Sequence, residues 1–152
     1  MPAKEVVFTV KLPLKMVWSF ISDRHEVGCL FPGCKGVRIL NDMDSIWTVR
    51  LSLGPFSRTV DIFTHNTEFK KGGKIAWDAK AEQFKSSGSI ALRRISENET
   101  EITYRIEAHV LGPLSMLQDI VAAEKLGEIT RQFVKNLKER LEWTAESEEE
   151  KN

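Results

Sequence analysis

The stretch "LSMLQDIVAAEKLGEITRQFVKNLKERLEW", residues 114–143, decides the fold. It follows Gly112 and Pro113 and contains no proline. Side chains of a mainly apolar stripe recur in it every three or four positions, which is the spacing of one helix face. The residues of this stripe are Leu126, Thr130, Phe133, Leu137 and Leu141. The pattern predicts one long helix that lies with this stripe against another layer.

Residues 37–110 provide that layer. Apolar and polar side chains alternate along this stretch, and turn signals separate the runs at 41–45, 54–55, 70–73 and 96–100. The pattern predicts about five or six consecutive antiparallel strands. One predicted face is apolar and comprises Trp47, Val49, Leu51, Leu53, Val60, Ile62, Ile75, Trp77, Ala79, Ile90, Leu92, Ile102, Tyr104, Ile106, Ala108 and Val110. The other comprises Thr48, Arg50, Thr59, Asp61, Asp78, Lys80, Ser89, Arg93, Thr103, Arg105, Glu107 and His109. Such a sheet is covered on one side only.

The N-terminal part predicts a further strand and two short helices. Residues 5–12 alternate as a half-buried strand does, and Pro13 suits the first position of a helix. Asp23, followed three residues later by Glu26, has the spacing of a capping box and predicts a second helix that stops before Pro32.

Together these elements predict an α+β helix-grip fold. A strongly curved antiparallel sheet of about six or seven strands wraps around the long C-terminal helix, with two short helices after the first strand. Such curvature leaves room for an apolar ligand under the helix. We expect one domain over residues 1–143 and a disordered acidic tail, "TAESEEEKN", over residues 144–152.

Composition excludes several classes of protein. The 152 residues are 41% hydrophobic and carry 22 basic and 22 acidic side chains, so no net positive field attracts nucleic acid. The N-terminus lacks the apolar core of a signal peptide, and no run approaches the roughly 18 apolar residues of a membrane span. These features predict a cytoplasmic protein whose two cysteines are thiols.

Several short motifs resemble a known family. The segment 8–37 contains a Val17-Trp18 pair in its proline-started helix and the turn Phe31-Pro32-Gly33-Cys34, and Gly54-Pro55 and "KSSGSIALRRI", residues 85–95, follow later. Over residues 5–142 the chain resembles the START-like (Bet v 1-like, SRPBCC) superfamily, and its branch related to the small G subunit of carbon monoxide dehydrogenase. That branch has isoleucine where Phe31 stands here.

The resemblance implies a small cytoplasmic domain that binds a hydrophobic molecule beside a molybdenum-containing hydroxylase, and that helps to attach this enzyme to the membrane or to couple it to quinone. Longer members carry a C-terminal apolar anchor. Because this chain ends in "ESEEEKN", we expect no direct membrane insertion. No cofactor is expected other than a bound lipid or quinone.

Cys29 and Cys34 admit three interpretations. A zinc site needs four ligands, and only three histidines are available to complete one, so we expect no metal. A redox pair would need the C-x-x-C spacing that lowers a thiol pKa. We favour a structural turn in which Gly28 and Gly33 permit close chain approach and both thiols pack as small apolar groups.

The inward face supplies the candidate site. The residues predicted to line a ligand cavity are Phe20, Trp47, Leu51, Ile62, Trp77, Ile90, Leu92, Tyr104, Ile106, Leu117 and Val121. For each one taken alone, the pattern favours ordinary core packing over ligand contact, because large apolar residues usually fill cores. Tyr104 is the only tyrosine, and its hydroxyl would bond either a ligand oxygen or the backbone and water.

We therefore expect a binding protein and no catalytic residues, because the inward face holds no carboxylate pair and no Ser-His pairing. Two alternatives stay open. One is a cyclase or hydrolase that uses Tyr104. The other is a ligand-free assembly or adaptor protein for the oxidoreductase, for which Trp18, off the apolar stripe of its helix, marks either a partner surface or partial burial against a loop.

Overall fold

A computed structural model of the chain describes residues 3–53, 56–82, 84–111 and 115–150. The predicted turn at Gly54-Pro55, and the Gly112-Pro113 pair that precedes the long helix, therefore lie outside the described residues. The elements follow one another as β1 (Ala3–Val10), α1 (Leu14–Ile21), α2 (Arg24–Leu30), β2 (Cys34–Ile39), β3 (Asp44–Leu53), β4 (Phe56–Lys70), β5 (Lys74–Ala81), β6 (Phe84–Ser96), β7 (Glu99–Val110) and α3 (Ser115–Glu150).

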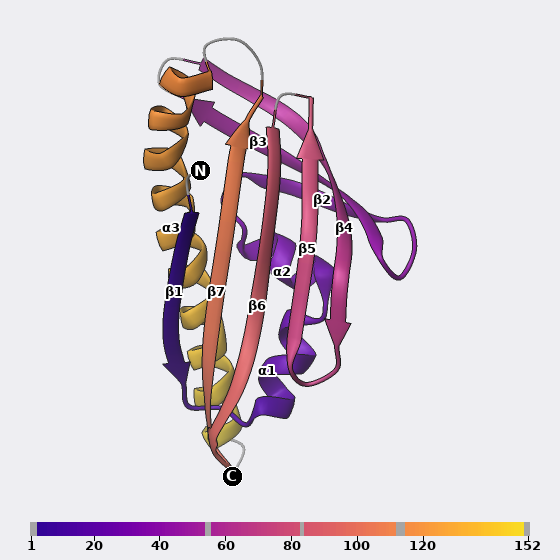
Figure 1. The fold of residues 1–152 in the computed structure, drawn as a ribbon. Helices are drawn as coiled ribbons and strands as arrows, with labels where there is room; N and C mark the ends of the chain where they lie inside the picture. The colour runs from indigo at the N-terminus through magenta and orange to yellow at the C-terminus, as the bar shows by residue number, and fades with distance from the viewer. Residues whose placement is uncertain (1–2, 54–55, 83, 112–114, 151–152) are drawn as a thin grey trace.

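The described strands form one seven-stranded antiparallel sheet in the order β1-β7-β6-β5-β4-β3-β2. Consecutive strands are neighbours throughout, except that β1 pairs with β7. Figure 1 shows β2 and β3 crossing at an angle to β6 and β7, so that the sheet curves around its helices. The helix α3 contacts β1 and β7, and α2 contacts β2. The predicted α+β helix-grip fold is confirmed.

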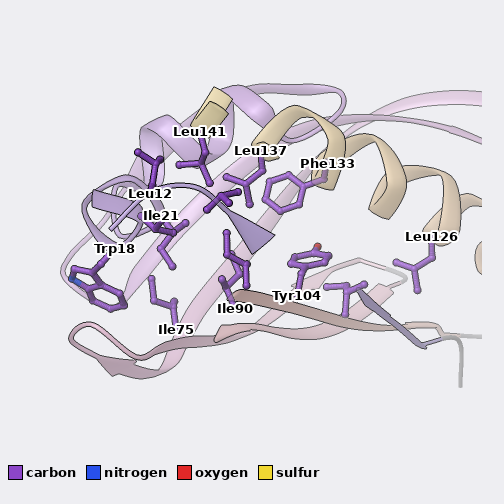
Figure 2. Packing of buried hydrophobic residues seen from close by; sticks show 14 of the residues in the cluster. Leu12, Trp18, Ile21, Ile75, Ile90, Tyr104, Leu126, Phe133, Leu137 and Leu141 are labelled. Atoms are coloured by element: carbon purple, nitrogen blue, oxygen red, sulfur yellow. The ribbon is translucent and has the colours of Figure 1, made fainter. Parts of the chain in front are cut away.

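The core lies between the inner face of the sheet and α3 (Figure 2). Ile102 and Ile90 of the sheet are 0% and 3% exposed, and Phe133 and Leu137 of α3 are 2% and 0% exposed. The predicted helix stripe is buried throughout, and Thr130 belongs to it. The inward apolar residues of the strands and the apolar stripe of the long helix therefore pack together in one core.

The outer face of the sheet carries pairs of polar side chains that join neighbouring strands. Arg93 of β6 lies opposite Glu101 of β7 in the register, and its Nε and Nη2 atoms donate to the two carboxylate oxygens at 3.1 and 3.0 Å. Thr48 Oγ1 donates to Asp61 Oδ1 at 2.7 Å across β3 and β4. Because Arg93 and Asp61 are exposed to solvent, these pairs fix strand register more than they add stability.

The two short helices confirm their predicted starts. Pro13 lies at the N-cap of α1, one position before its first helical residue. Asp23 caps α2, and its Oδ1 accepts from the backbone amides of His25 at 3.0 Å and Glu26 at 3.3 Å. The reciprocal bond from the Glu26 side chain does not form, because the Asp23 amide donates to the Phe20 carbonyl instead.

Trp18 is a buried residue, so its interpretation as a partner surface is wrong. Its side chain is 8% exposed, and its ring meets Phe69 of β4 edge-on at a centroid distance of 5.3 Å. The single apolar stripe of α1 does not reveal this burial, because the short helix is covered on more than one side: it packs on α2 as well as on β6 and β7.

The helix α3 extends beyond its predicted end. It continues to Glu150, so the prediction of a disordered tail is wrong for residues 144–150. Thr144 joins this last part to the preceding turn: its hydroxyl accepts from Arg140 Nη1 at 2.7 Å and donates to the Arg140 carbonyl at 3.1 Å. Alanine and glutamate favour a helix, and extending an existing helix needs no new nucleus.

The turn between α2 and β2 depends on its glycines. Gly33 has φ of +79°, and a Cβ there would overlap the backbone carbonyl oxygen of Arg50. The Gly33 carbonyl in turn accepts from the Arg50 amide at 2.8 Å. A Cβ on Gly28 would stand 2.5 Å from Val37 Cγ2. Both glycines therefore permit the predicted close approach, which holds α2 and the turn against β2 and β3.

The cysteines are both free thiols. Cys34 is half-buried, and its Sγ donates to the Gly36 carbonyl at 3.6 Å, whereas Cys29 is exposed. The expectation that both thiols pack as small apolar groups is therefore wrong for Cys29. Burial raises the pKa of the Cys34 thiol, which keeps it protonated at neutral pH. Within the described residues no three histidine, cysteine or acidic side chains gather as metal ligands do.

Candidate ligand-binding cavity

A cavity of about 130 Å³ lies between the inner face of the sheet and the helices. Strands β3 to β7 form its floor. Its cover comes from three places: the junction of α1 and α2, the turn that follows α2, and Phe133 of α3. Most of its lining is apolar, because the inward positions of the curved sheet carry the aliphatic and aromatic side chains of the alternating pattern.

Six of the eleven residues predicted to line a cavity come together here, namely Trp47, Ile62, Trp77, Ile90, Tyr104 and Ile106. Leu51, Leu92 and Phe20 lie elsewhere. Leu51 is half-buried further along β3, Leu92 packs on the core beyond Ile90, and Phe20 lies under the Arg140 guanidinium at 5.2 Å. The side chains of Leu117 and Val121 lie outside what the structure describes. The binding role of the six residues stays a prediction.

The sequence prediction missed two groups of lining residues. One group covers the cavity, with Phe133 and Phe31 among its members. The other lies on the sheet and includes Thr64 and Asn66 on β4, which share the inward parity of Ile62. Parity along β4 would have identified both, but their polar side chains resemble those of a solvated face.

Five aromatic rings form a continuous chain around the cavity. Trp47 lies 6.2 Å from Phe31, which lies 5.9 Å from Phe133, between ring centroids. Phe133 is 5.0 Å from Tyr104, which is 6.4 Å from Trp77. Tilted and edge-on pairs at such distances are each worth about 0.5–1.5 kcal/mol beyond the area they bury. We call these five residues the aromatic arc.

The arc is oriented by hydrogen bonding at one end. Trp47 Nε1 donates to the hydroxyl of Ser45, which is 1% exposed, at 3.0 Å. This bond satisfies a polar indole group that faces an apolar space. The Trp47 ring is thereby fixed in place as part of the cavity wall.

Tyr104 supplies a polar atom to an apolar space. Its side chain is 3% exposed, and Figure 2 shows its oxygen directed between the sheet and Phe133. Burial raises its pKa far above the ordinary tyrosine range, so the phenol stays protonated at neutral pH. The described residues give this hydroxyl no hydrogen-bond partner. It can therefore donate one bond to a ligand oxygen, and it is unsuited to act as a general base.

Gly88 leaves the space that the Trp77 indole occupies. A Cβ on Gly88 would stand 2.5 Å from Trp77 Cζ2 and 2.7 Å from Cε2. We expect Gly88→Ala to push the indole into the cavity and to weaken binding of an apolar ring such as cumene by about tenfold, the equivalent of about 1.4 kcal/mol. Titration of cumene followed by backbone amide chemical shifts would measure this. Unchanged affinity would show that the indole has another place to move to.

The fold and the cavity together define a class of protein. A curved antiparallel sheet that closes on a long C-terminal helix around an apolar cavity is the helix-grip architecture of START-like proteins. Residues 7–142 match the model of the CoxG family, the G subunit of carbon monoxide dehydrogenase. The chain belongs to this family. Among curated proteins, no sequence matches it significantly.

Solved structures share the fold at low sequence identity. A conserved protein from Geobacillus kaustophilus superposes with a TM-score of 0.76 at 17% identity, covering 91% of this chain and 94% of its own. A START superfamily protein from Mycobacterium smegmatis gives 0.75 at 17% identity, covering 93% and 98%. The Zhui aromatase/cyclase from a Streptomyces species gives 0.65 at 17% identity, covering 95% and 93%. The START-like resemblance is thus confirmed for the fold.

None of the described helices combines the length and the apolar character that a membrane crossing requires.

Proposed function

We propose that this protein binds a small hydrophobic molecule of lipid, isoprenoid or quinone type in the cavity between its sheet and α3. The observation that carries the proposal is the aromatic arc around a cavity of about 130 Å³. Apolar cavities of about 150 Å³ in other proteins stay dry and take up benzene. A space of this size and lining therefore favours an apolar guest over water.

The volume limits how much of the ligand is enclosed. It suits one ring, or the end of one branched chain, and not a whole lipid. The remainder of a longer molecule has to lie outside the cavity or displace side chains that cover it. The covering residues include Val27 of α2 and Phe31 of the turn that follows it, and both side chains are half-buried.

We further propose that the protein acts as an accessory of a molybdenum-containing hydroxylase of carbon monoxide dehydrogenase type. Membership of the CoxG family supports this part of the proposal. A ligand-free adaptor is the alternative. Burial of Trp18 removes the exposed aromatic on which that alternative relied.

An enzyme of cyclase type is a further candidate because one structural neighbour is an aromatase/cyclase and Tyr104 directs a hydroxyl into the cavity. The structural likeness, at 17% identity, concerns the fold alone. A Tyr104→Phe variant that loses turnover of a polyketide-like substrate while keeping affinity for it would favour this candidate. Equal turnover by both proteins would remove it.

The decisive experiment is native mass spectrometry of protein purified gently from its own host, followed by organic extraction of whatever is released. We expect a stoichiometric apolar molecule in the wild type and less of it in Gly88→Ala, whose cavity is smaller. A wild-type protein that arrives empty, and stays empty when offered quinones and fatty acids, would contradict ligand binding and favour the adaptor.

A further inference from the structure

The cavity has one polar side, formed where α2 faces the start of β3 and the middle of β4. Arg24 and Asn66 both line it there. Both residues are hydrogen-bonded to the same short segment before and at the start of β3. The Asn66 backbone amide donates to the Met43 carbonyl at 2.7 Å, and the Arg24 side chain donates through Nη1 to the Asp44 carbonyl at 3.2 Å. Two segments far apart in the sequence thereby bring a guanidinium and a carboxamide to the same cavity wall.

Asn66 is a buried polar side chain with spare bonding capacity. It is 6% exposed and faces inward next to Trp77, its register partner on β5. Within the described residues neither its amide nitrogen nor its oxygen has a hydrogen-bond partner. Its carboxamide atoms are not sealed off in the interior, because Thr130 Oγ1 is the one fully buried side-chain polar atom left unpartnered in the described residues; the Asn66 side chain therefore opens onto the cavity, where a partner can reach it. A ligand oxygen in the cavity would accept from its NH₂ group.

Arg24 also has donors to spare. One of its five N–H groups reaches the Asp44 carbonyl, and no ion pair joins Arg24 to an acidic side chain in the described part of the chain. The charge of Arg24 helps to lower the pKa of Asp44, but the Asp44 carboxylate is already hydrogen-bonded elsewhere: it accepts from Asn41 Nδ2 at 2.9 Å and contacts His65 Nδ1 at 2.6 Å. The guanidinium is therefore free to bind an oxygen from the cavity side.

We infer that the ligand is amphipathic and carries a carbonyl or carboxylate oxygen that accepts hydrogen bonds from Arg24 and Asn66, while its apolar ring or chain lies against the aromatic arc. This inference rests on the proposed function and specifies its ligand class. Strands β6 and β7 and α3 contribute mainly apolar contact through Ile90, Ile106 and Phe133, and their polar atoms at the cavity are the hydroxyls of Tyr104 and Ser86. The two sides together orient the ligand with its oxygen toward α2.

Three small probes of the same size test the inference. Cumene, acetophenone and benzoate share a benzene ring and the same number of non-hydrogen atoms, and they differ in carrying no oxygen, a carbonyl or a carboxylate. Each is titrated into the full chain, and dissociation constants are taken from backbone amide shifts. Because cumene is intrinsically the most hydrophobic, the informative quantity is the change of each affinity on mutation.

We expect Asn66→Leu to lower the affinity for acetophenone by about 3- to 10-fold, which corresponds to the loss of one neutral hydrogen bond. The affinity for cumene should stay the same or increase. We expect Arg24→Gln to lower the affinity for benzoate by about 10- to 100-fold, which corresponds to the loss of one charge-assisted hydrogen bond. Arg58→Gln is the matched control, because that arginine is 68% exposed and pairs with Glu82 on the surface. Asn66→Ala replaces Asn66→Leu if the larger residue prevents folding.

The outcomes separate the inference from the function on which it rests. Equal changes for all three probes in the Asn66 and Arg24 variants would overturn the inference and leave apolar binding intact. A lower affinity for acetophenone in Tyr104→Phe, with unchanged affinity in the Asn66 and Arg24 variants, would place the ligand oxygen at the tyrosine. That result would also overturn the inference. Failure of wild-type protein to bind any of the probes would contradict the proposed function itself.

Discussion

Replacing Phe133 by alanine is expected to lower the free energy of unfolding by about 3–5 kcal/mol, the range for deleting a fully buried phenylalanine ring. Phe133 is 2% exposed and lies between Phe31 and Tyr104 at the centre of the aromatic arc. It is also the residue through which α3 lines the cavity, within the described part of the chain. Urea unfolding followed by circular dichroism would measure the loss.

The same variant should enlarge the cavity and accept larger guests, such as a naphthalene ring, that wild-type protein excludes. Trp143→Ala is the control, because Trp143 is 58% exposed and its ring stacks on Arg140 at 4.8 Å. Its expected cost is below about 1 kcal/mol. Similar losses in the two variants would mean that Phe133 is not the centre of the core.

Gly33→Ala is expected to destabilise the protein by about 2–4 kcal/mol. The left-handed backbone at φ of +79° penalises any side chain, and the added Cβ would overlap the Arg50 carbonyl oxygen. Relief would require the turn to move away from β3, which would also break the bond between the Gly33 carbonyl and the Arg50 amide.

The neighbouring Gly36 is a matched control, since a Cβ there would meet no atom within 4 Å. Gly36→Ala should change the free energy of unfolding by less than about 0.5 kcal/mol. Urea midpoints of the two variants, measured side by side, would check the difference. A Gly33→Ala protein as stable as Gly36→Ala would show that the turn yields without cost.

Most of the fold could be predicted because its signals are local. Alternation located the strands of the meander, helical spacing located α3, and Asp23 indicated the start of α2. The burial of Trp18 could not be read from α1 alone, since it depends on Phe69, which is distant in the sequence and turns toward α1. The end of α3 was missed because its charged sequence shows no apolar stripe, although Ala145 packs against the core.

The cavity was less predictable, for a physical reason. Alternation assigns a residue to a face of the sheet, but it does not say how far along the strand the cavity extends. Leu51 and Leu92 therefore have the predicted face and the wrong position. Asn66 was missed for the opposite reason: it lies at the cavity but was not predicted there. In the sequence, a polar side chain in a cavity is indistinguishable from a surface residue until the neighbouring strands are placed beside it.

The pairing of β1 with β7 has a consequence for how the chain is made. Every other ladder joins strands that are neighbours in the sequence, but Val6 of β1 lies opposite Tyr104 of β7. During synthesis the first strand therefore remains without a partner until β7 has left the ribosome. Folding should begin in the hairpins of the meander and end when β1 closes the sheet beside α3, because long-range pairing is slow.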